Sequence, residues 1–598
     1  MPDPQPLEEL HSAAVASIGA AMTSRFGAVP LSESELVAYR AHAIRTGWRF
    51  SVAYGDGERR LDLLIPKTVP FGLPKVALVD RPEDLTWPHI ESDGTLCVAD
   101  SAVTIDVRDP VGVAVEILRE ADKLIQANLA GNRQDFLDEF HSYWHRAGGA
   151  HGKRFLSLID VGPPSRTIRA WRGREFVLLA DHDARILGWL QKRYGKPKNP
   201  WTTTPAVFVW LEEPLVPEQY PKLSGDVIRL LANIEQNSVA TLETLAQTVP
   251  DKITLLLGAL SKNGPCLAGI TLDRPATIKL SGAARHPYLP GFRPCHTPAP
   301  LLAASYLNST TPITKSNVSR VDASWIHGRG HDPRQRLLAD AIIILAGCGS
   351  VGGHVGVLLA EAGVGRLIFV DPQNLEWANT GRHPLGAKSV DSPKAGSLEA
   401  ELRQMYPHLE ITAHNVAWEE LAKSNPSVLQ SASIIINATG SWMSNAAMNA
   451  WQRTLKGPTV LYGWTEAYAC AGHAVAIGAD GACLECGFDH LGHPKMPITA
   501  WISGATERRE PACGAIFQPY GPIELMNIVQ LIASAALDIL TKRRGVGTHW
   551  AYASHDSFLK DCGGKWNPEW ASVSGWKPEG GCTIVRQWLR RPDCLGSH

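Results

Sequence analysis

Residues 342–352, Ile-Ile-Ile-Leu-Ala-Gly-Cys-Gly-Ser-Val-Gly, place an apolar β-branched run directly before a glycine-rich loop. A long apolar segment with helical character follows at 354–362. Glycines in this G-x-G-x-x-G spacing let backbone amides approach a phosphate at a helix N-terminus. Asp371 comes about 20 residues after the loop, where an acid can bind ribose hydroxyls. The residues expected to contact a nucleotide are Gly347, Gly349, Ser350, Gly352 and Asp371.

The surrounding sequence alternates strand-like and helix-like segments, which predicts a doubly wound parallel sheet of the Rossmann type. The expected strands are residues 341–346, 366–371, 409–414, 433–438 and 459–464. The glycines alone fit an NAD-binding domain equally well.

Three polar residues after the second strand favour a different chemistry, namely Asn379, Arg382 and Lys394. A dehydrogenase needs no such cations at this place. Adenylation does need them, because charge builds up on the triphosphate as a carboxylate attacks the α-phosphorus.

With these residues, the chain resembles ubiquitin-activating enzymes and their bacterial sulfur-carrier adenylating relatives (the ThiF/HesA/MoeB type) over roughly residues 325–540. The resemblance implies that ATP and Mg²⁺ bind here, with Asp371 on the ribose and Asn379, Arg382 and Lys394 on the phosphates. Two positions depart from the family. Gln373 stands where a second acid is usual, and Gly440 stands where a magnesium-binding Asp is expected.

Cys513 lies in a loop just before the apolar stretch 523–540, which we expect to be a buried helix. Family members that transfer their cargo to a cysteine often hold it at this place, which implies that Cys513 is catalytic. A thiolate near a helix N-terminus is favoured by the dipole, and Arg508 and Arg509 would lower its pKa further. The alternative is a buried structural cysteine.

A second reactive cysteine is predicted near the N-terminus, in residues 87–98, Trp-Pro-His-Ile-Glu-Ser-Asp-Gly-Thr-Leu-Cys-Val. Its spacing resembles the active site of ubiquitin-conjugating enzymes, and the resemblance covers about residues 20–145. It implies that Cys97 carries an acyl group. Trp87 and His89 replace the family's His and Asn. His89 can donate a hydrogen bond to an oxyanion or act as a base, or it can simply be a packed loop histidine.

A zinc site is a further possibility. Cys483 and Cys486 form a C-x-x-C pair, and the adenylating family often has a structural zinc with a first pair near here. Zinc needs four ligands, so two late residues would have to complete the site, with Cys582 and Cys594 as candidates besides Cys562 and His598. Ordinary reduced cysteines are the alternative.

Composition sets the broad class. The 598 residues predict more than one domain, and 44% hydrophobic with 20% charged residues is ordinary for a globular protein. The net charge of −1 gives no argument for nucleic acid or a membrane surface as a partner. A polar N-terminus and eleven scattered cysteines predict a reducing cytoplasm.

The expected organisation is an α+β conjugating domain at 1–150, a mixed connecting domain at 151–300 and an adenylation domain at 301–598. In the connecting domain we expect strands at 176–179 and 206–211 and helices at 224–237 and 242–262. A Pro-rich linker should follow at 287–300.

The resulting hypothesis is ATP-dependent adenylation of a carrier protein's C-terminus, thioester transfer to Cys513 and then Cys97, and conjugation to a target lysine. Fused enzymes of this kind are similar to those of type II CBASS anti-phage systems, whose cargo is a nucleotidyltransferase related to cyclic GMP–AMP synthase. Three alternatives remain open: an enzyme serving a dedicated bacterial ubiquitin-like protein, a sulfur-carrier adenylyltransferase with a non-catalytic N-terminal module, or a non-catalytic scaffold. Family members pair through their sheets, which predicts a homodimer, and Arg329 or Arg334 of one chain then completes the ATP site of the other.

Overall fold

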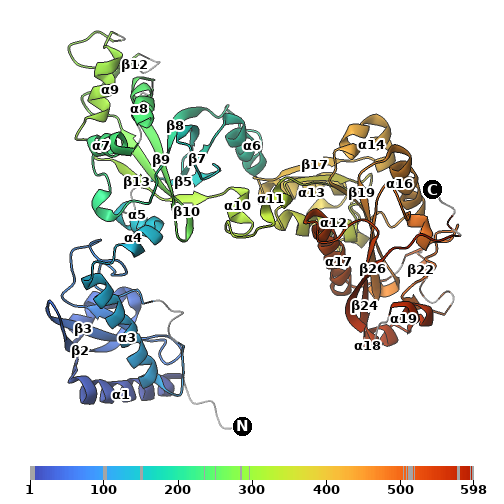
Figure 1. The fold of residues 1–598 in the computed structure, drawn as a ribbon, viewed down its shortest axis with the longest axis horizontal. Coiled ribbons are helices and arrows are strands. Elements are labelled where there is room, and N and C mark those ends of the chain that lie inside the picture. The colour runs from blue at the N-terminus through green and yellow to red at the C-terminus, as the bar shows by residue number, and fades with distance from the viewer. Residues whose placement is uncertain are drawn as a thin grey trace. The chain divides into compact units, whose positions relative to one another are not determined.

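The structure, a computed structural model, divides into two compact units. One unit contains residues 1–181 and 203–319, and the other contains 182–202 and 320–598 (Figure 1). The described residues are 7–98, 104–148, 152–234, 236–248, 251–282, 286–294, 296–502, 504, 506, 508–509, 516–517, 519–574, 580–592 and 594. The domain boundaries at 150 and 300 stay predictions, while the mixed α/β class is confirmed.

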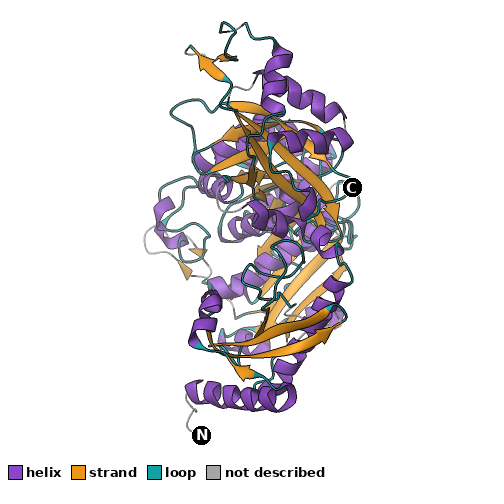
Figure 2. Ribbon diagram, turned by 90° about the vertical axis from the view of Figure 1, so that its left-hand side faces the viewer, coloured by secondary structure: helices purple, strands orange, loops and turns teal. Residues whose placement is uncertain are grey.

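The first unit begins with a four-stranded antiparallel sheet in the order β1-β2-β3-β4. Its members are β1 (Val29–Pro30), β2 (Ile44–Tyr54), β3 (Gly57–Pro66) and β4 (Lys75–Leu78). Helices α1 (Leu7–Phe26) and α3 (Pro110–Leu129) pack with it, and Figure 2 shows α1 beside the strands. Ile18, Leu63 and Ile117 lie in the shared core. Both strands and helices are present, as expected for an α+β domain.

An eight-stranded sheet follows in the same unit, in the order β13-β10-β9-β8-β6-β7-β5-β14. Its strands are β5 (Arg154–Ser157), β6 (Arg166–Arg172), β7 (Phe176–Ala180), β8 (Thr203–Trp210), β9 (Lys252–Ser261), β10 (Gly264–Asp273), β13 (Thr314–Ser316) and β14 (Val318–Arg320). A two-stranded ribbon, β11 (Lys279–Ser281) and β12 (His286–Tyr288), lies apart from this sheet. The predicted strands at 176–179 and 206–211 are present as β7 and β8.

Two expectations for this region are wrong. The helix expected over 242–262 ends as α8 (Gln236–Thr248), after α7 (Ser224–Ile234), and β9 follows it. Residues 253–259 are all buried, and a strand buried on both faces reads as a continuous apolar run without period-two alternation. The Pro-rich stretch is not a linker, because it contains part of β12 and the start of α9 (Ala299–Leu307), whose Leu302 and Tyr306 belong to the same core.

The second unit contains an eight-stranded sheet in the order β17-β16-β15-β18-β19-β20-β24-β26. The strands are β15 (Ile342–Ala346), β16 (Arg366–Val370), β17 (Glu410–His414), β18 (Ile434–Asn437), β19 (Thr459–Thr465), β20 (Ala471–Ile477), β24 (Thr548–His555) and β26 (Gly580–Gln587). The first five in the order pair in parallel and the last three antiparallel. All five strands predicted here are present, and β15 is central, with Ile344 opposite Ile368 and Ile435.

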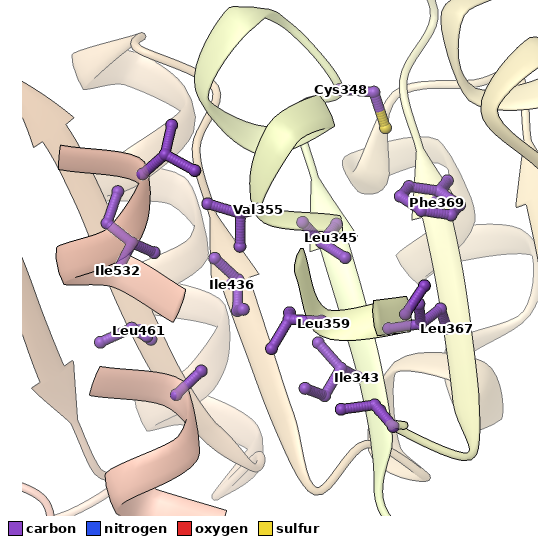
Figure 3. Packing of buried hydrophobic residues seen from close by; sticks show 14 of the residues in the cluster. Ile343, Leu345, Cys348, Val355, Leu359, Leu367, Phe369, Ile436, Leu461 and Ile532 are labelled. Carbon is purple, nitrogen blue, oxygen red and sulfur yellow. The ribbon is translucent and has the colours of Figure 1, made fainter. Parts of the chain in front are cut away.

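Helices α12 (Ser350–Glu361) and α17 (Pro522–Leu540) cover one face of this sheet. Figure 3 shows Val355 and Leu359 of α12 packed toward Ile436 of the sheet, with Ile532 of α17 nearby. Helix α17 is long and apolar enough to cross a membrane, by length and composition only. Its buried residues belong to the core of the sheet, which confirms the expected buried helix.

Candidate active sites

The glycine loop lies against the backbone that follows β18. Gly347 has a φ of +89°, and a Cβ at this residue would lie 2.7 Å from the Thr439 nitrogen. A Cβ at Gly352 would lie 1.9 Å from the Gly347 oxygen. Gly349 caps α12 at Ser350, and space is open around it. The loop is therefore tightly held where it meets the sheet and open at the N-terminus of α12, as a phosphate site requires.

Asp371 follows β16 and is held beside this loop. One carboxylate oxygen accepts a hydrogen bond from the Cys348 N–H at 2.6 Å, and the other accepts from the Gln373 N–H at 2.7 Å. The residue is only 5% exposed. These bonds fix the carboxylate at the carboxyl edge of the sheet, next to the open end of α12.

Lys394 is the first residue of α13 (Lys394–Met405) and lies close to Asp371 in the folded chain. Its Nζ donates to Gln373 Oε1 at 2.9 Å, and the residue is 7% exposed. Gln373 stands where the family usually has a second acid. The hydrogen-bond partner of the buried Lys394 ammonium is therefore a neutral amide. A buried cation is stabilised best by an anion, which makes a phosphate oxygen a better partner than the amide.

Arg382 reaches the same edge of the sheet from the segment after β16. Its Nη1 donates to the Ala378 carbonyl at 2.9 Å, and its guanidinium carbon is 5.5 Å from the centre of the Tyr520 ring. The Tyr520 hydroxyl is 2.8 Å from Ser350 Oγ in the glycine loop. Sequence reasoning missed Tyr520, whose only signal was an aromatic side chain directly ahead of the apolar helix. Asn379 lies one turn before Arg382, and its Oδ1 accepts from the Glu376 N–H at 3.1 Å.

His383 is a second residue that sequence reasoning did not assign. Its Nε2 donates to the Cys348 carbonyl at 2.7 Å, and its Nδ1 accepts from the Leu385 N–H at 3.1 Å. Burial lowers the pKa of His383, and this bonding pattern requires a neutral ring. The ring ties the Arg382 segment to the glycine loop.

The expected magnesium position offers no side chain. Gly440 has a φ of +66°, and the turn before it is closed by Asn437, whose Oδ1 accepts from the N–H and hydroxyl of Thr439 at 3.2 and 2.9 Å. Asn437 is buried. This turn is a backbone element that supports Gly347, and it supplies no carboxylate to a metal.

Cys97 is exposed in the loop that follows β4. Its N–H donates to the His89 carbonyl at 2.8 Å, and the neighbouring Leu96 N–H donates to the Val76 carbonyl at 2.7 Å. The cysteine borders a cavity of about 470 Å³. The other lining residues are Leu73, Pro74, Lys75, Val76, Leu96, Val98, Ile105 and Ile117. An exposed thiol at the edge of an open cavity is accessible to an acyl donor.

The His89 ring faces two carboxylates. Its Nε2 is 3.2 Å from Asp135 Oδ2, and its Nδ1 is 3.8 Å from Glu139 Oε2. The His89 N–H donates to the Tyr143 hydroxyl at 2.9 Å, and the backbone has a φ of +61°. Burial raises the pKa of Tyr143, and Glu139, Asp135 and Cys97 raise it further. His89 is therefore part of a polar cluster near Cys97, and its chemical role stays a prediction.

Cys513 lies outside the described residues. On either side of it, β22 (Arg508–Arg509) pairs antiparallel with β23 (Ile516–Phe517), and α17 begins at Pro522. Its catalytic role stays a prediction.

Three of the cysteines considered for zinc come together. Cys483 Sγ is 3.4 Å from Cys594 Sγ and 3.9 Å from Cys486 Sγ. A tetrahedral zinc with Zn–S bonds of about 2.3 Å holds sulfurs about 3.8 Å apart, so these separations fit the metal. Burial, together with the neighbouring thiols, raises the pKa of Cys483 to about 12. Among the described residues the metal-type cluster contains these three cysteines and not Cys582, which packs against the hydrophobic cluster that contains Trp570; His598 is not described.

Two protein-family models match parts of this chain. Residues 326–558 match the ThiF family, and residues 20–150 match the prokaryotic E2 family B. The chain thus contains one domain of each family. It is similar to an ATP-dependent ubiquitin transferase-like protein Cap2 of Pseudomonas aeruginosa, with 25% identity over 356 residues, 57% of this chain and 61% of the relative. The matched part of the chain thus spans about three fifths of that relative's length.

Two further likenesses cover smaller parts of the chain. The sulfur carrier protein ThiS adenylyltransferase of Bacillus subtilis is 26% identical over 164 residues, 26% of this chain and 46% of that protein. The crystal structure of E. coli MccB with MccA-N7isoASN covers 44% of this chain and 68% of that one, at 15% identity and a TM-score of 0.31.

Proposed function

We propose that this chain, which joins a prokaryotic E2 domain to a ThiF-family domain, activates the C-terminus of a carrier protein with ATP and conjugates it to an amine. The observation that carries the proposal is the convergence of Lys394, Arg382 and Asp371 on one open glycine loop. Two cations beside a helix N-terminus suit stabilisation of a charged phosphoryl transition state.

In the adenylation step, the α12 amides and the Lys394 ammonium hold the phosphates of ATP, and Asp371 holds its ribose. Arg382, packed on Tyr520, lies where the departing pyrophosphate gathers charge. Asn379 supports the same segment. Magnesium accompanies the nucleotide, but Gly440 gives it no side chain, so no protein ligand is assigned to it.

In the transfer steps, Cys513 takes the acyl group from the adenylate and Cys97 takes it from Cys513. Thioesters suit this relay because a thiolate is both a good nucleophile and a good leaving group. Carrying both cysteines on one chain raises the effective concentration of the acceptor. A target lysine then attacks the thioester at Cys97, near His89.

For the carrier we propose a nucleotidyltransferase related to cyclic GMP–AMP synthase, in bacterial anti-phage defence. The resemblance to the fused enzymes of type II CBASS systems motivates this choice, and the Cap2 relative, an ATP-dependent ubiquitin transferase-like protein, supports the transferase activity. A dedicated ubiquitin-like protein is the alternative. The likeness to the Bacillus subtilis enzyme is what favours a sulfur-carrier adenylyltransferase. Sulfur transfer would not require a reactive cysteine at Cys97. The cluster of Cys483, Cys486 and Cys594 is proposed to hold a structural zinc.

The first prediction tests adenylation directly. With an isolated cyclase of this type as the carrier, Lys394→Ala and Arg382→Ala should each lower carrier-dependent ATP–pyrophosphate exchange by about 10²-fold or more. Lys388→Ala is the matched control, because Lys388 is an exposed lysine paired with Glu401 in the same stretch. Exchange at the unmodified rate in both variants, with the protein folded, would refute the assignment.

A further inference from the structure

Two short helices after α3 belong to a different core from the Cys97 region. They are α4 (Gln134–Asp138) and α5 (Phe140–Gly148). Their buried Phe136 and Phe140 pack with the middle sheet and its helices, in the cluster that contains Val216 and Leu231. The hydrophobic core around Cys97 instead contains Leu96, Val76 and Ile117. The carboxylates of Asp135 and Glu139 are therefore presented to His89 by elements fixed to the neighbouring sheet.

The distances give the two carboxylates different roles. His89 Nε2 lies 3.2 Å from Asp135 Oδ2, an ion-pair separation, so we place the proton of the neutral ring on Nε2, which leaves Nδ1 as its proton acceptor. Glu139 lies 3.8 Å from Nδ1, which is too long for a hydrogen bond but within the range of an ion pair. An ammonium group can bridge that gap, donating one hydrogen to Glu139 and one to Nδ1.

The cluster is close to the reactive cysteine. The His89 carbonyl accepts from the Cys97 N–H, and Tyr143, which receives the His89 N–H, is within electrostatic range of Asp135, Glu139 and Cys97 together. The arginines nearest to the cluster in the chain are engaged elsewhere, Arg133 with Glu218 and Arg146 with Asp84. Asp135 and Glu139 remain partly exposed, with 35% and 43% of their side chains open to solvent. The cluster is thus an accessible acidic site.

We propose that Asp135, His89 and Glu139 form the acceptor-amine site of Cys97, selective for cationic primary amines such as a lysine side chain. The inference rests on the proposed function. Glu139 binds the ammonium, and His89 Nδ1 takes one of its protons while Asp135 holds the ring. Asp135 is therefore a positioning residue, as the acid of a catalytic triad is.

The step balances as follows. The ammonium gives one proton to His89, and the freed nitrogen lone pair attacks the thioester carbonyl carbon. The new C–N bond forms, the C–S bond breaks, and the sulfur of Cys97 leaves with the electron pair. The departing sulfur takes the second proton of the attacking nitrogen, and His89 returns its proton to water. The products are an amide and a free Cys97 thiol.

The test needs no knowledge of the carrier and does not involve ATP. The intact chain is acylated at Cys97 with the mercaptoethanesulfonate thioester of N-acetylglycylglycine, and loss of the acyl group from the Cys97 peptide is followed by mass spectrometry. Free lysine is compared with hydroxylamine, which is largely uncharged at neutral pH. Hydroxylamine therefore needs neither an anionic group to bind it nor a general base to deprotonate it.

Glu139→Gln and Asp135→Asn should slow discharge to lysine by about 10²-fold and leave discharge to hydroxylamine within about twofold of the unmodified chain. Asp135→Glu should recover part of the lysine rate. Asp138→Asn is the matched control on α4, since Asp138 accepts from Gln134 and should change neither rate.

Three outcomes would overturn the inference. Lysine rates unaffected by Glu139→Gln and Asp135→Asn would remove the acids from the reaction. Equal losses toward both amines would show a merely structural effect. Discharge from Cys97 no faster than from the same thioester of N-acetylcysteine would show no amine site at all. Because no adenylation occurs in the assay, failure of the proposed ATP-dependent function would leave these results unchanged.

Discussion

Gly347 and Gly352 determine how closely the nucleotide loop packs against the sheet. A Cβ at Gly352 would overlap the Gly347 oxygen at 1.9 Å, whereas a Cβ at Gly349 would meet no atom within 4 Å. Gly349 and Gly352 belong to one motif but have different roles. Gly352 serves the packing of the loop, and Gly349 serves the approach of the ligand.

The second prediction separates these duties. Gly352→Ala should destabilise the adenylation domain by about 1–3 kcal/mol, because a backbone oxygen has to move, and it should lower the first thermal unfolding transition by several degrees. Gly349→Ala should melt as the unmodified chain does and still lose pyrophosphate exchange, since its new methyl group occupies the phosphate space. Equal melting temperatures for both variants, measured by calorimetry, would contradict this division.

At the scale of residues, the sequence predicts the site residues whose roles follow from their spacing along the chain. The glycines, Asp371, Arg382 and Lys394 are of this kind, and the structure gathers them at one edge of the sheet. Tyr520, Asp135 and Glu139 could not be predicted, because they reach their sites through tertiary packing from distant segments.

At the scale of elements, the parallel strands were predictable and β9 was not. The glycine loop is a turn signal at the end of β15, and this signal identifies the segment before it as a strand. The run at 253–259 is buried throughout and lacks such a signal, so periodicity alone did not distinguish a central strand from a buried helix. The late cysteines show the same limit. Cys582 and Cys594 were equal candidates by sequence, and only the turn of the chain after β26 brings Cys594 to Cys483.

The third prediction concerns this cysteine cluster. Purified protein should contain about one zinc per chain, and Cys483→Ser or Cys594→Ser should lose the metal and melt at a lower temperature. Cys582→Ser should keep it, because its sulfur lies in a hydrophobic cluster with Trp570. The metal is measured by plasma mass spectrometry. A zinc-free protein whose stability is unaffected by Cys594→Ser would remove the metal from the account.

At the scale of the whole molecule, the adenylation sheet and the Cys97 site lie in different compact units of one chain. In the proposed relay the acyl group therefore passes from one unit to the other. The predicted dimer would bring a second chain to the ATP site through the Arg-rich segment at 328–336, which precedes β15. Arg334 donates to Asp332, and Arg329 lies 6.0 Å from the Trp325 ring.

The fourth prediction is that the protein is a homodimer in which Arg329 or Arg334 reaches the partner's ATP site. Light scattering at micromolar concentration should give twice the chain mass. Mixing inactive Lys394→Ala chains with inactive Arg329→Ala chains should restore part of the exchange activity, because one site in each mixed dimer then has both residues. If Arg329→Ala alone is fully active, the same mixing is carried out with Arg334→Ala. A fully active monomer would refute the prediction.

The central claim is that Cys513 is loaded before Cys97, and a non-reducing gel with carrier and ATP tests it most directly. The account predicts that Cys513→Ala makes adenylate but carries no thiol-sensitive adduct on either cysteine. Cys97→Ala should keep a thiol-sensitive adduct at Cys513 and make no conjugate, and Cys97→Lys should trap the carrier through an amide that dithiothreitol does not cleave. Conjugation of targets at the unmodified rate by Cys97→Ala would contradict the account.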